Sequence, residues 1–223
     1  MTFDIAAAIA EVRGRIEAAA QRSGRDPREI TLVAVSKTYP AETIREAMAA
    51  GLNVFGENRV QEAEAKIGEI GRDVCWHLIG HLQSNKARKA VQLIDVIHSL
   101  DSVELAERLE RICLEEGRNR LDVLVQVDLA GEAAKSGVTE ADLSLLTKYL
   151  ATCKCLLLKG FMLMPPFFED AEDTRPYFRR LREIRDEMLP GGELSMGMSH
   201  DLEVAIEEGA TMVRVGTSIF GRR

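Results

Sequence analysis

Short apolar runs alternate with amphipathic segments along most of this chain. Eight runs rich in β-branched and other apolar residues have the length expected of buried strands. They span residues 31–37, 54–58, 74–80, 96–100, 121–128, 156–164, 193–197 and 211–215. The segments between them place apolar residues three and four positions apart, as in a helix with one buried face. This alternation predicts a parallel sheet covered by helices.

The predicted helices begin and end at residues with known end preferences. Residues 3–22 form an amphipathic helix that we expect against the outside or bottom of the fold. Pro40 starts the next helix and Gly51 closes it. Asp101 and Glu104 resemble a capping box. The remaining helices are predicted at about residues 59–70, 84–93, 141–150, 175–187 and 201–208.

Eight successive strand and helix units favour a (β/α)8 barrel, the TIM-barrel architecture. The units follow one another without a linker or low-complexity segment, so we expect residues 1–223 to form one barrel domain with the N-terminal helix attached. A doubly wound open sheet is the alternative, and the number of strands disfavours it.

Composition narrows the possible functions. Hydrophobic residues make up 46% of the chain and charged residues 29%, which is enough for a substantial core. The net charge of -7 argues against nucleic acid as a partner, because proteins that bind phosphate backbones carry basic surfaces. The sequence shows neither a membrane-length apolar run nor a signal peptide, and the four cysteines lack disulfide or zinc spacing. We therefore expect a cytoplasmic monomer with reduced thiols.

Lys37 is the first candidate for chemistry. It ends the first predicted strand and shares a face with Thr31, Val33 and Val35, because side chains alternate along a strand. If that face points into a closed core, the ammonium is partly desolvated, loses its proton more easily and can add to an aldehyde. The alternative is a lysine that ends a strand and faces water.

Glycine and hydroxyl residues follow the last two predicted strands. Ser195–Ser199 ends the seventh strand and Gly216–Gly221 ends the eighth. Such barrels often hold phosphate in these two loops, through backbone N–H groups and hydroxyls. Ser199 can instead be an ordinary helix N-cap and Gly216 a tight turn. Asp201 is an unsuitable neighbour for phosphate, and we expect it to point elsewhere.

Arg214 shares a strand face with Met212 and Gly216, and one face of a barrel strand points inward. A buried guanidinium needs a partner, and an ion pair with an interior carboxylate is the simplest one. Strands one and eight are neighbours in a closed barrel, so Lys37 and Arg214 can converge. Together with the two loops they fit pyridoxal 5′-phosphate (PLP): the lysine binds the aldehyde, the arginine donates to the pyridine nitrogen and the loops hold the phosphate.

Several motifs in fixed order make the sequence similar to the pyridoxal phosphate homeostasis proteins, also called the YggS/PROSC family or PLP-binding proteins. They are residues 31–37, 55–58 with 60–62, 76–86, 97–102, 135–137, 195–199 and 214–221. The resemblance implies a barrel like the N-terminal domain of bacterial alanine racemase, with PLP on Lys37. It also implies that Arg214 contacts the pyridine nitrogen and that Ser199, Gly216 and Thr217 hold the phosphate. His200 departs from the family pattern, which usually has an acidic residue there.

Two further groups of residues leave alternatives open. Asn58 and His81 are expected at the mouth near the cofactor, although Asn58 can also be the N-cap of the next helix. His77 and His81 have the spacing of a metal pair on a helix, but Gly80 and the strand pattern argue against one. Lys135 is either a second amine for incoming PLP or a solvated loop lysine.

The expected chemistry is that of a carrier. A guanidinium cannot accept the proton of the pyridine nitrogen, so the bound cofactor is a weak electron sink. Racemisation also needs a second acid or base, and of the three tyrosines only Tyr39 lies near Lys37, while Tyr149 and Tyr177 fall on predicted outer helices. We predict a non-catalytic protein of intracellular PLP homeostasis that supplies apo PLP-dependent enzymes. A PLP-dependent amino-acid racemase and a cofactor-free Schiff-base aldolase are the alternatives.

Overall fold

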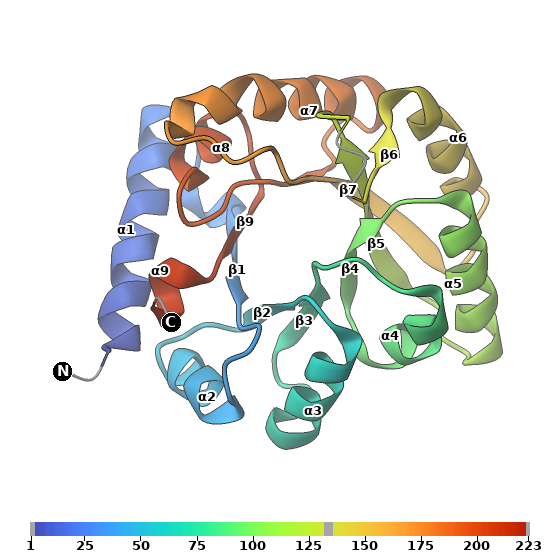
Figure 1. Ribbon diagram of the computed structural model, residues 1–223, viewed down its shortest axis with the longest axis horizontal. Helices are drawn as coiled ribbons and strands as arrows, with labels where there is room; N and C mark the ends of the chain where they lie inside the picture. Colours follow the sequence, from blue (N-terminus) through green and yellow to red (C-terminus); the bar gives the residue numbers. More distant parts are fainter. Residues whose placement is uncertain (1–2, 132–135, 222–223) are drawn as a thin grey trace.

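The computed structural model describes residues 3–131 and 136–221, and its parallel strands close into a barrel (Figure 1). Neighbouring strands follow the order β4-β3-β2-β1-β9-β8-β7-β5, and pairing of β4 with β5 completes the ring. The barrel strands are β1 (Thr31–Val35), β2 (Val54–Glu57), β3 (Cys75–Leu78), β4 (Val96–Leu100), β5 (Leu121–Asp128), β7 (Leu156–Leu163), β8 (Glu193–Ser195) and β9 (Met212–Val215). The predicted (β/α)8 barrel is confirmed, and the open sheet is wrong.

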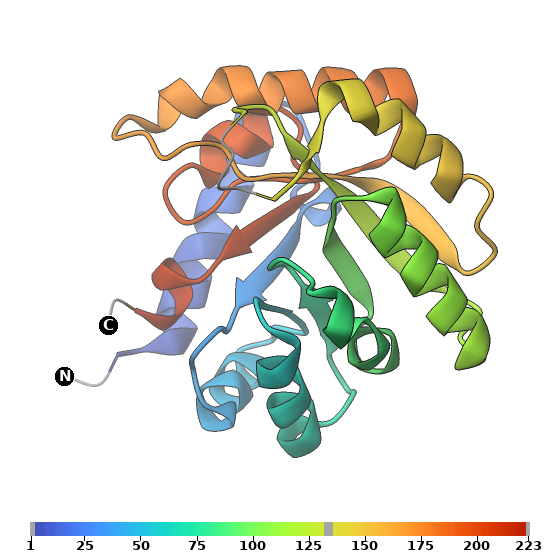
Figure 2. The same ribbon diagram turned by 45° about the vertical axis from the view of Figure 1, so that its right-hand side comes forward.

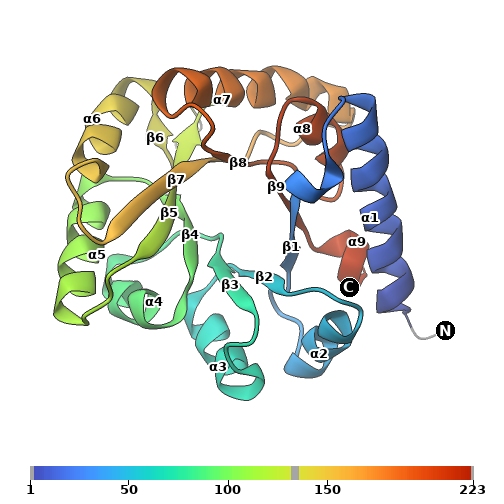
Figure 3. The same cartoon turned by 180° about the vertical axis from the view of Figure 1, so that it is seen from behind.

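Helices surround the barrel on the outside, as the views from the front and from behind agree (Figures 1 and 3). The N-terminal helix α1 packs against α8 and α9 on the outer side, as predicted. The helices are α1 (Ile5–Arg22), α2 (Ala41–Ala49), α3 (Val60–Ile70), α4 (Ala87–Leu93), α5 (Val103–Glu115), α6 (Glu140–Leu150), α7 (Arg175–Met188), α8 (Leu202–Glu207) and α9 (Thr217–Phe220). Short 3-10 turns are η1 (Pro27–Glu29), η2 (Ser84–Lys86) and η3 (Ala171–Thr174).

The two faces of the strands carry different kinds of side chain. Outward-facing residues such as Phe55 and Trp76, whose ring centroids are 5.8 Å apart, join the apolar layer beneath the helices. The buried polar side chains of His98, Ser195 and Arg214 instead meet through hydrogen bonds. Branched apolar residues usually fill the interior of such barrels. The interior of this barrel is therefore less apolar than usual, because it contains a hydrogen-bonded group of polar side chains.

Several element boundaries differ from the predictions. The first strand ends at Val35, two residues earlier than predicted, because the chain turns there: the Tyr39 amide donates to the Ser36 carbonyl at 3.1 Å. Ser102, and not Asp101, caps α5, since its hydroxyl accepts from the Leu105 amide at 3.2 Å. The predictions also missed α9 and the two-residue strand β6 (Val138–Thr139), which pairs with β5.

All four cysteines are free thiols, and burial raises the pKa of Cys75 and Cys113 to about 11. Among the helices of the described residues, none combines the length and apolar character that crossing a membrane requires.

Gly160 provides a test of strand packing in the barrel wall. A Cβ atom at this position would lie 1.9 Å from the carbonyl oxygen of Glu193 on β8, and backbone cannot move aside cheaply. We expect Gly160→Ala to lower the free energy of unfolding by about 3 kcal/mol or more, measured by urea denaturation. Gly68→Ala on α3 is the control: its Cβ meets nothing within 4 Å, and alanine is the better helix former, so it should stabilise by about 0.5–1 kcal/mol. A stable Gly160→Ala protein would contradict the tight pairing of β7 and β8.

Candidate functional site

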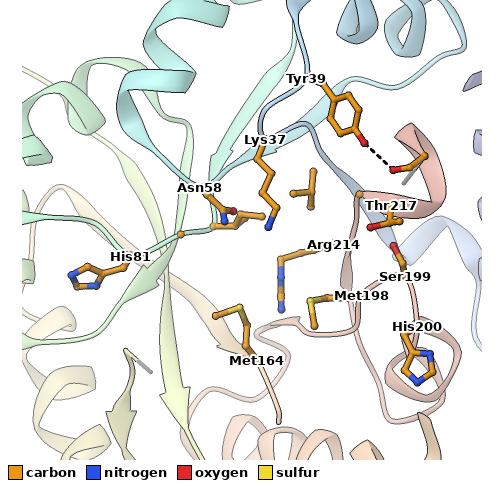
Figure 4. A pocket seen from close by; sticks show the side chains of 15 residues that line it. Lys37, Tyr39, Asn58, His81, Met164, Met198, Ser199, His200, Arg214 and Thr217 are labelled. Carbon is orange, nitrogen blue, oxygen red and sulfur yellow. Dashed lines mark hydrogen bonds between the residues drawn. The ribbon is translucent and has the colours of Figure 1, made fainter. Parts of the chain in front are cut away.

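A cavity of about 720 Å³ opens at the carboxyl ends of the barrel strands (Figure 4). This volume suits a small-molecule cofactor. The cavity brings together all six predicted cofactor-binding residues, which come from the loops after β1, β2 and β8 and from β9 and its loop. The lining residues are Val35, Lys37, Tyr39, Asn58, Ile79, Gly80, His81, Met164, Met198, Ser199, His200, Arg214, Gly216, Thr217 and Gly221.

Lys37 enters the cavity from a turn rather than from the strand. The residue follows the end of β1 and is exposed, so the expectation of a partly desolvated ammonium in a closed core is wrong. Its side chain extends into the pocket toward Arg214 (Figure 4). The turn that begins at Ser36 is the cause. It places Lys37 outside the packed interior of the barrel but next to the cavity.

Arg214 lies deeper, with only 3% of its surface exposed. Its Nη1 donates to Ser195 Oγ at 2.6 Å and its Nη2 donates to the Leu163 carbonyl at 2.8 Å. In the described part of the chain no carboxylate forms an ion pair with it, so the predicted interior carboxylate partner is not found. Burial lowers the pKa of Arg214 to about 10, which still leaves the guanidinium charged at neutral pH. The pocket therefore has a buried positive charge held by neutral groups.

Two histidines extend this arrangement across the barrel. His98 Nδ1 lies 2.8 Å from Ser195 Oγ, and His98 Nε2 lies 2.8 Å from His77 Nδ1. Burial lowers the pKa of His77 to about 4 and that of His98 well below its ordinary value, so both rings are neutral at pH 7. Because Arg214 can only donate, we assign the direction of the chain: Ser195 donates to His98, and His98 donates to His77. This chain fixes the orientation of the guanidinium.

The loops after β8 and β9 form the opposite side of the cavity. Ser199 Oγ accepts from the Ser218 amide at 3.4 Å, which ties the two loops together. Gly216 packs closely on β1, since a Cβ there would lie 3.2 Å from the Val35 carbonyl oxygen. Thr217 begins α9 and also lines the cavity. Hydroxyls and backbone N–H groups are the usual ligands of phosphate in barrels of this type.

The start of α8 decides one alternative for these loops. Ser199 is not a helix N-cap, because Asp201 occupies that position before α8. The buried Asp201 carboxylate accepts from the Met198 amide at 2.7 Å, and Asp201 is not among the residues that line the cavity. Arg15 steadies the same loop by donating to the Ser199 carbonyl at 3.0 Å.

Asn58, His77 and His81 occupy different parts of the mouth and interior. Asn58 lines the cavity, and the N-cap of α3 is Arg59, so the capping alternative for Asn58 is wrong. His81 lies at the rim, with Nδ1 3.1 Å from Asp101 Oδ2, whereas His77 bonds to His98 in the interior. Lys135, the suggested second amine, lies outside the described residues.

Tyr39 is a lining residue whose role the sequence did not reveal. Its hydroxyl donates to the Gly221 carbonyl at 2.8 Å, and its ring lies 5.0 Å from that of Phe220 (Figure 4). The tyrosine thus joins the loop after β1 to the end of α9. Its position two residues after Lys37 was the available signal. Tyr149 and Tyr177 lie on the outer helices α6 and α7, as predicted.

Taken together, the cavity presents an amine, a buried guanidinium and two hydroxyl-bearing loops. An amine can bond reversibly to an aldehyde, a guanidinium can donate to a ring nitrogen, and hydroxyls with amides can bind an anion. These features define a barrel whose cavity fits a small anionic carbonyl compound.

Comparison with known proteins places this barrel in a family. The model for the N-terminal domain of alanine racemase matches residues 9–223. A pyridoxal phosphate homeostasis protein from Aquifex aeolicus is 44% identical, with 96% of each chain covered. PipY of Synechococcus elongatus, solved with PLP bound, is 44% identical over 97% of this chain and all of its own, with a TM-score of 0.85. The chain belongs to the family of pyridoxal phosphate homeostasis proteins, within the wider group that shares the alanine racemase N-terminal domain.

The similarity to an alanine racemase shows only that the fold is shared. Alanine racemase from Corynebacterium glutamicum is 16% identical, with a TM-score of 0.66, and this chain covers 60% of it. The match covers 95% of the present chain, so the barrel architecture is shared while the remainder of the racemase has no counterpart in that match.

The neutral histidines predict a specific acid sensitivity. A buried His77 with a pKa of about 4 takes up its proton less readily than in the unfolded chain, so stability is lost as the pH falls below about 6.5. Between pH 7 and pH 5 this histidine contributes a loss of about 2 kcal/mol. We expect His77→Gln to show a correspondingly smaller decrease in unfolding free energy over that interval, measured by urea denaturation. The exposed His81, changed to Gln, should behave like the wild type. Equal pH dependence in all three proteins would contradict the neutral chain.

Proposed function

We propose that this protein binds PLP reversibly in the cytoplasm, as a Schiff base on Lys37, and serves intracellular PLP homeostasis without strong catalytic activity. The observation that carries the proposal is the convergence of Lys37, Arg214 and Ser199 on one cavity. The relative that has been solved with PLP bound, PipY, supports it at 44% identity over nearly the whole chain.

The residues present fit the cofactor. The Arg214 guanidinium is buried among neutral partners, and its two hydrogen bonds to described residues use two of five donors. A remaining N–H group is available for a pyridine nitrogen. Ser199, Gly216 and Thr217 would hold the phosphate, and Asn58 would line the side of the ring. Lys37 would supply the amine that bonds to the aldehyde.

Arg214 also argues for a holding role. When bound, PLP supplies an aldehyde and an electron-withdrawing ring. A charged guanidinium donates to the ring nitrogen without protonating it, so the ring withdraws electrons only weakly. Tyr39, the tyrosine lining this cavity, donates its hydroxyl to Gly221 and is therefore engaged in structure. These features favour retention of the cofactor over racemisation of an amino acid.

Exposure of Lys37 supports exchange of the cofactor. Water reaches the lysine at the mouth of the cavity, so a bond between its amine and an aldehyde can hydrolyse. We propose a monomer that releases PLP to apo PLP-dependent enzymes.

Replacement of Lys37 tests the binding mode. We expect Lys37→Ala to abolish the yellow absorbance of the PLP complex and to lower PLP affinity by about 100-fold, because the covalent link is lost while the phosphate contacts remain. Borohydride reduction followed by mass spectrometry should place PLP on Lys37 in the wild type. Lys89→Ala, a replacement on the outer helix α4, is the control and should leave the spectrum unchanged. Label on another lysine, including Lys135, would refute the assignment.

A racemisation assay tests the absence of catalysis. Wild-type protein loaded with PLP should interconvert L- and D-alanine at no more than about the rate of free PLP, because Arg214 leaves the ring a weak electron sink and the Tyr39 hydroxyl is engaged with Gly221. Chiral chromatography measures the two enantiomers. Turnover at rates typical of enzymes, about 1 s⁻¹ or more, would favour the racemase alternative instead.

A further inference from the structure

We propose that Glu62 and Lys66 of α3, supported by Glu57 at the end of β2, are positioning residues that direct the Lys37 amine into the cavity. This inference rests on the proposed function, since it concerns the amine to which PLP would bond. None of the three residues lines the cavity. They act through the backbone of Lys37.

Both peptide groups that flank the Lys37 Cα atom are held by side chains of α3. The Ser36 carbonyl, which precedes Lys37, accepts from Lys66 Nζ at 2.7 Å. The Thr38 amide, which follows Lys37, donates to Glu62 Oε1. The two peptide planes determine the direction of the Cα–Cβ bond. Holding both planes therefore fixes the direction in which the lysine side chain leaves the backbone.

The ammonium of Lys66 is fully used in this arrangement. Besides the Ser36 carbonyl, it donates to Glu57 Oε1 and Glu62 Oε1, each at 2.7 Å. An ammonium has three donors, and all three have acceptors here. Glu57 is completely buried and its Oε1 also accepts from Ser36 Oγ at 2.6 Å. The carboxylate of Glu57 thus anchors the ammonium, and the ammonium orients Glu62 toward Thr38.

Thr38 gives an independent reason for this anchoring. Its φ angle is 67°, which is the left-handed region, and it is the single residue other than glycine with a positive φ in the described ranges. A β-branched residue adopts this conformation only when its surroundings impose it. The hydrogen bond from its amide to Glu62 is such a constraint, located immediately after the lysine.

A role in general stability is the competing explanation. Buried ion pairs are weak evidence for stability, because desolvation offsets much of the attraction. Glu64, two residues after Glu62 on the same helix, pairs with Lys89 at 2.7 Å on the exposed outer surface. It offers a matched control: the same residue type and the same helix, but no contact with the turn that carries Lys37.

The experiment compares two ligands in the full chain. PLP can bond to Lys37, whereas pyridoxine 5′-phosphate has an alcohol in place of the aldehyde and cannot. We expect Glu62→Ala to weaken PLP binding about tenfold, because the amine is less well directed, and to leave the affinity for pyridoxine 5′-phosphate unchanged. Fluorescence titration gives both affinities, and circular dichroism checks folding. Lys66→Met, which keeps the aliphatic stem, should have the same selective effect.

Three controls make the outcome specific. Glu64→Ala should change neither affinity. Glu62→Gln should retain most of the PLP affinity, because its amide oxygen still accepts from Thr38. In the Lys37→Ala background, Glu62→Ala should cause no further loss, since the residue acts through the missing amine.

Different results would contradict the positioning role and the proposed function. Equal weakening of both ligands by Glu62→Ala and Lys66→Met, or no weakening of either, would overturn the positioning role. If Glu62→Ala does not fold, Lys66→Met decides the question by the same comparison, and Glu62→Gln serves as the folded variant that should keep its PLP affinity. Failure of the wild type to form the yellow complex with PLP would instead overturn the proposed function.

Discussion

A charged guanidinium buried inside the barrel is the constraint on which the site depends. Desolvation makes such a charge costly unless its surroundings supply hydrogen bonds. Here the hydrogen bonds come from the Ser195 hydroxyl and the Leu163 carbonyl. Two neutral histidines, beginning with His98, orient the Ser195 hydroxyl. These hydrogen-bond partners carry no charge, and the Asp201 carboxylate acts on the guanidinium through its charge rather than through a hydrogen bond. The polar interior is explained by this requirement.

Closure of the barrel brings the turn that carries Lys37 close to Arg214. β1 pairs with β9 in parallel, with Val33 opposite Arg214 and Ala34 opposite Val215. The turn that follows β1 therefore lies beside the carboxyl end of β9 (Figure 2). Lys37 and Arg214 both line the same cavity (Figure 4). The glycine at 216 permits the two strands' loops to approach closely. Topology, rather than sequence proximity, assembles the site.

Much of this arrangement could be predicted from the sequence. Apolar periodicity locates the barrel strands within one to two residues at most ends, and parallel topology places their carboxyl ends together. Lys37 was misjudged because a left-handed Thr38 leaves no periodic signal and ends the strand early. The partners of Arg214 were missed because Ser195 and Leu163 lie on other strands, 19 and 51 residues away along the chain. His98, which bonds to Ser195, is 97 residues from it and meets it only across the closed barrel. Short elements such as α9 contain too few residues for a helical pattern to emerge.

The seam between β1 and β9 also has a consequence for how the molecule folds. Its two strands are separated by most of the chain, so their contact is among the most non-local in the barrel, and loop-closure entropy opposes its early formation. A partly folded intermediate with an open seam would carry the lysine and the arginine on separate edges. A ligand that contacts both the turn after β1 and Arg214 needs this seam closed, so by mass action such a ligand would stabilise the closed ring.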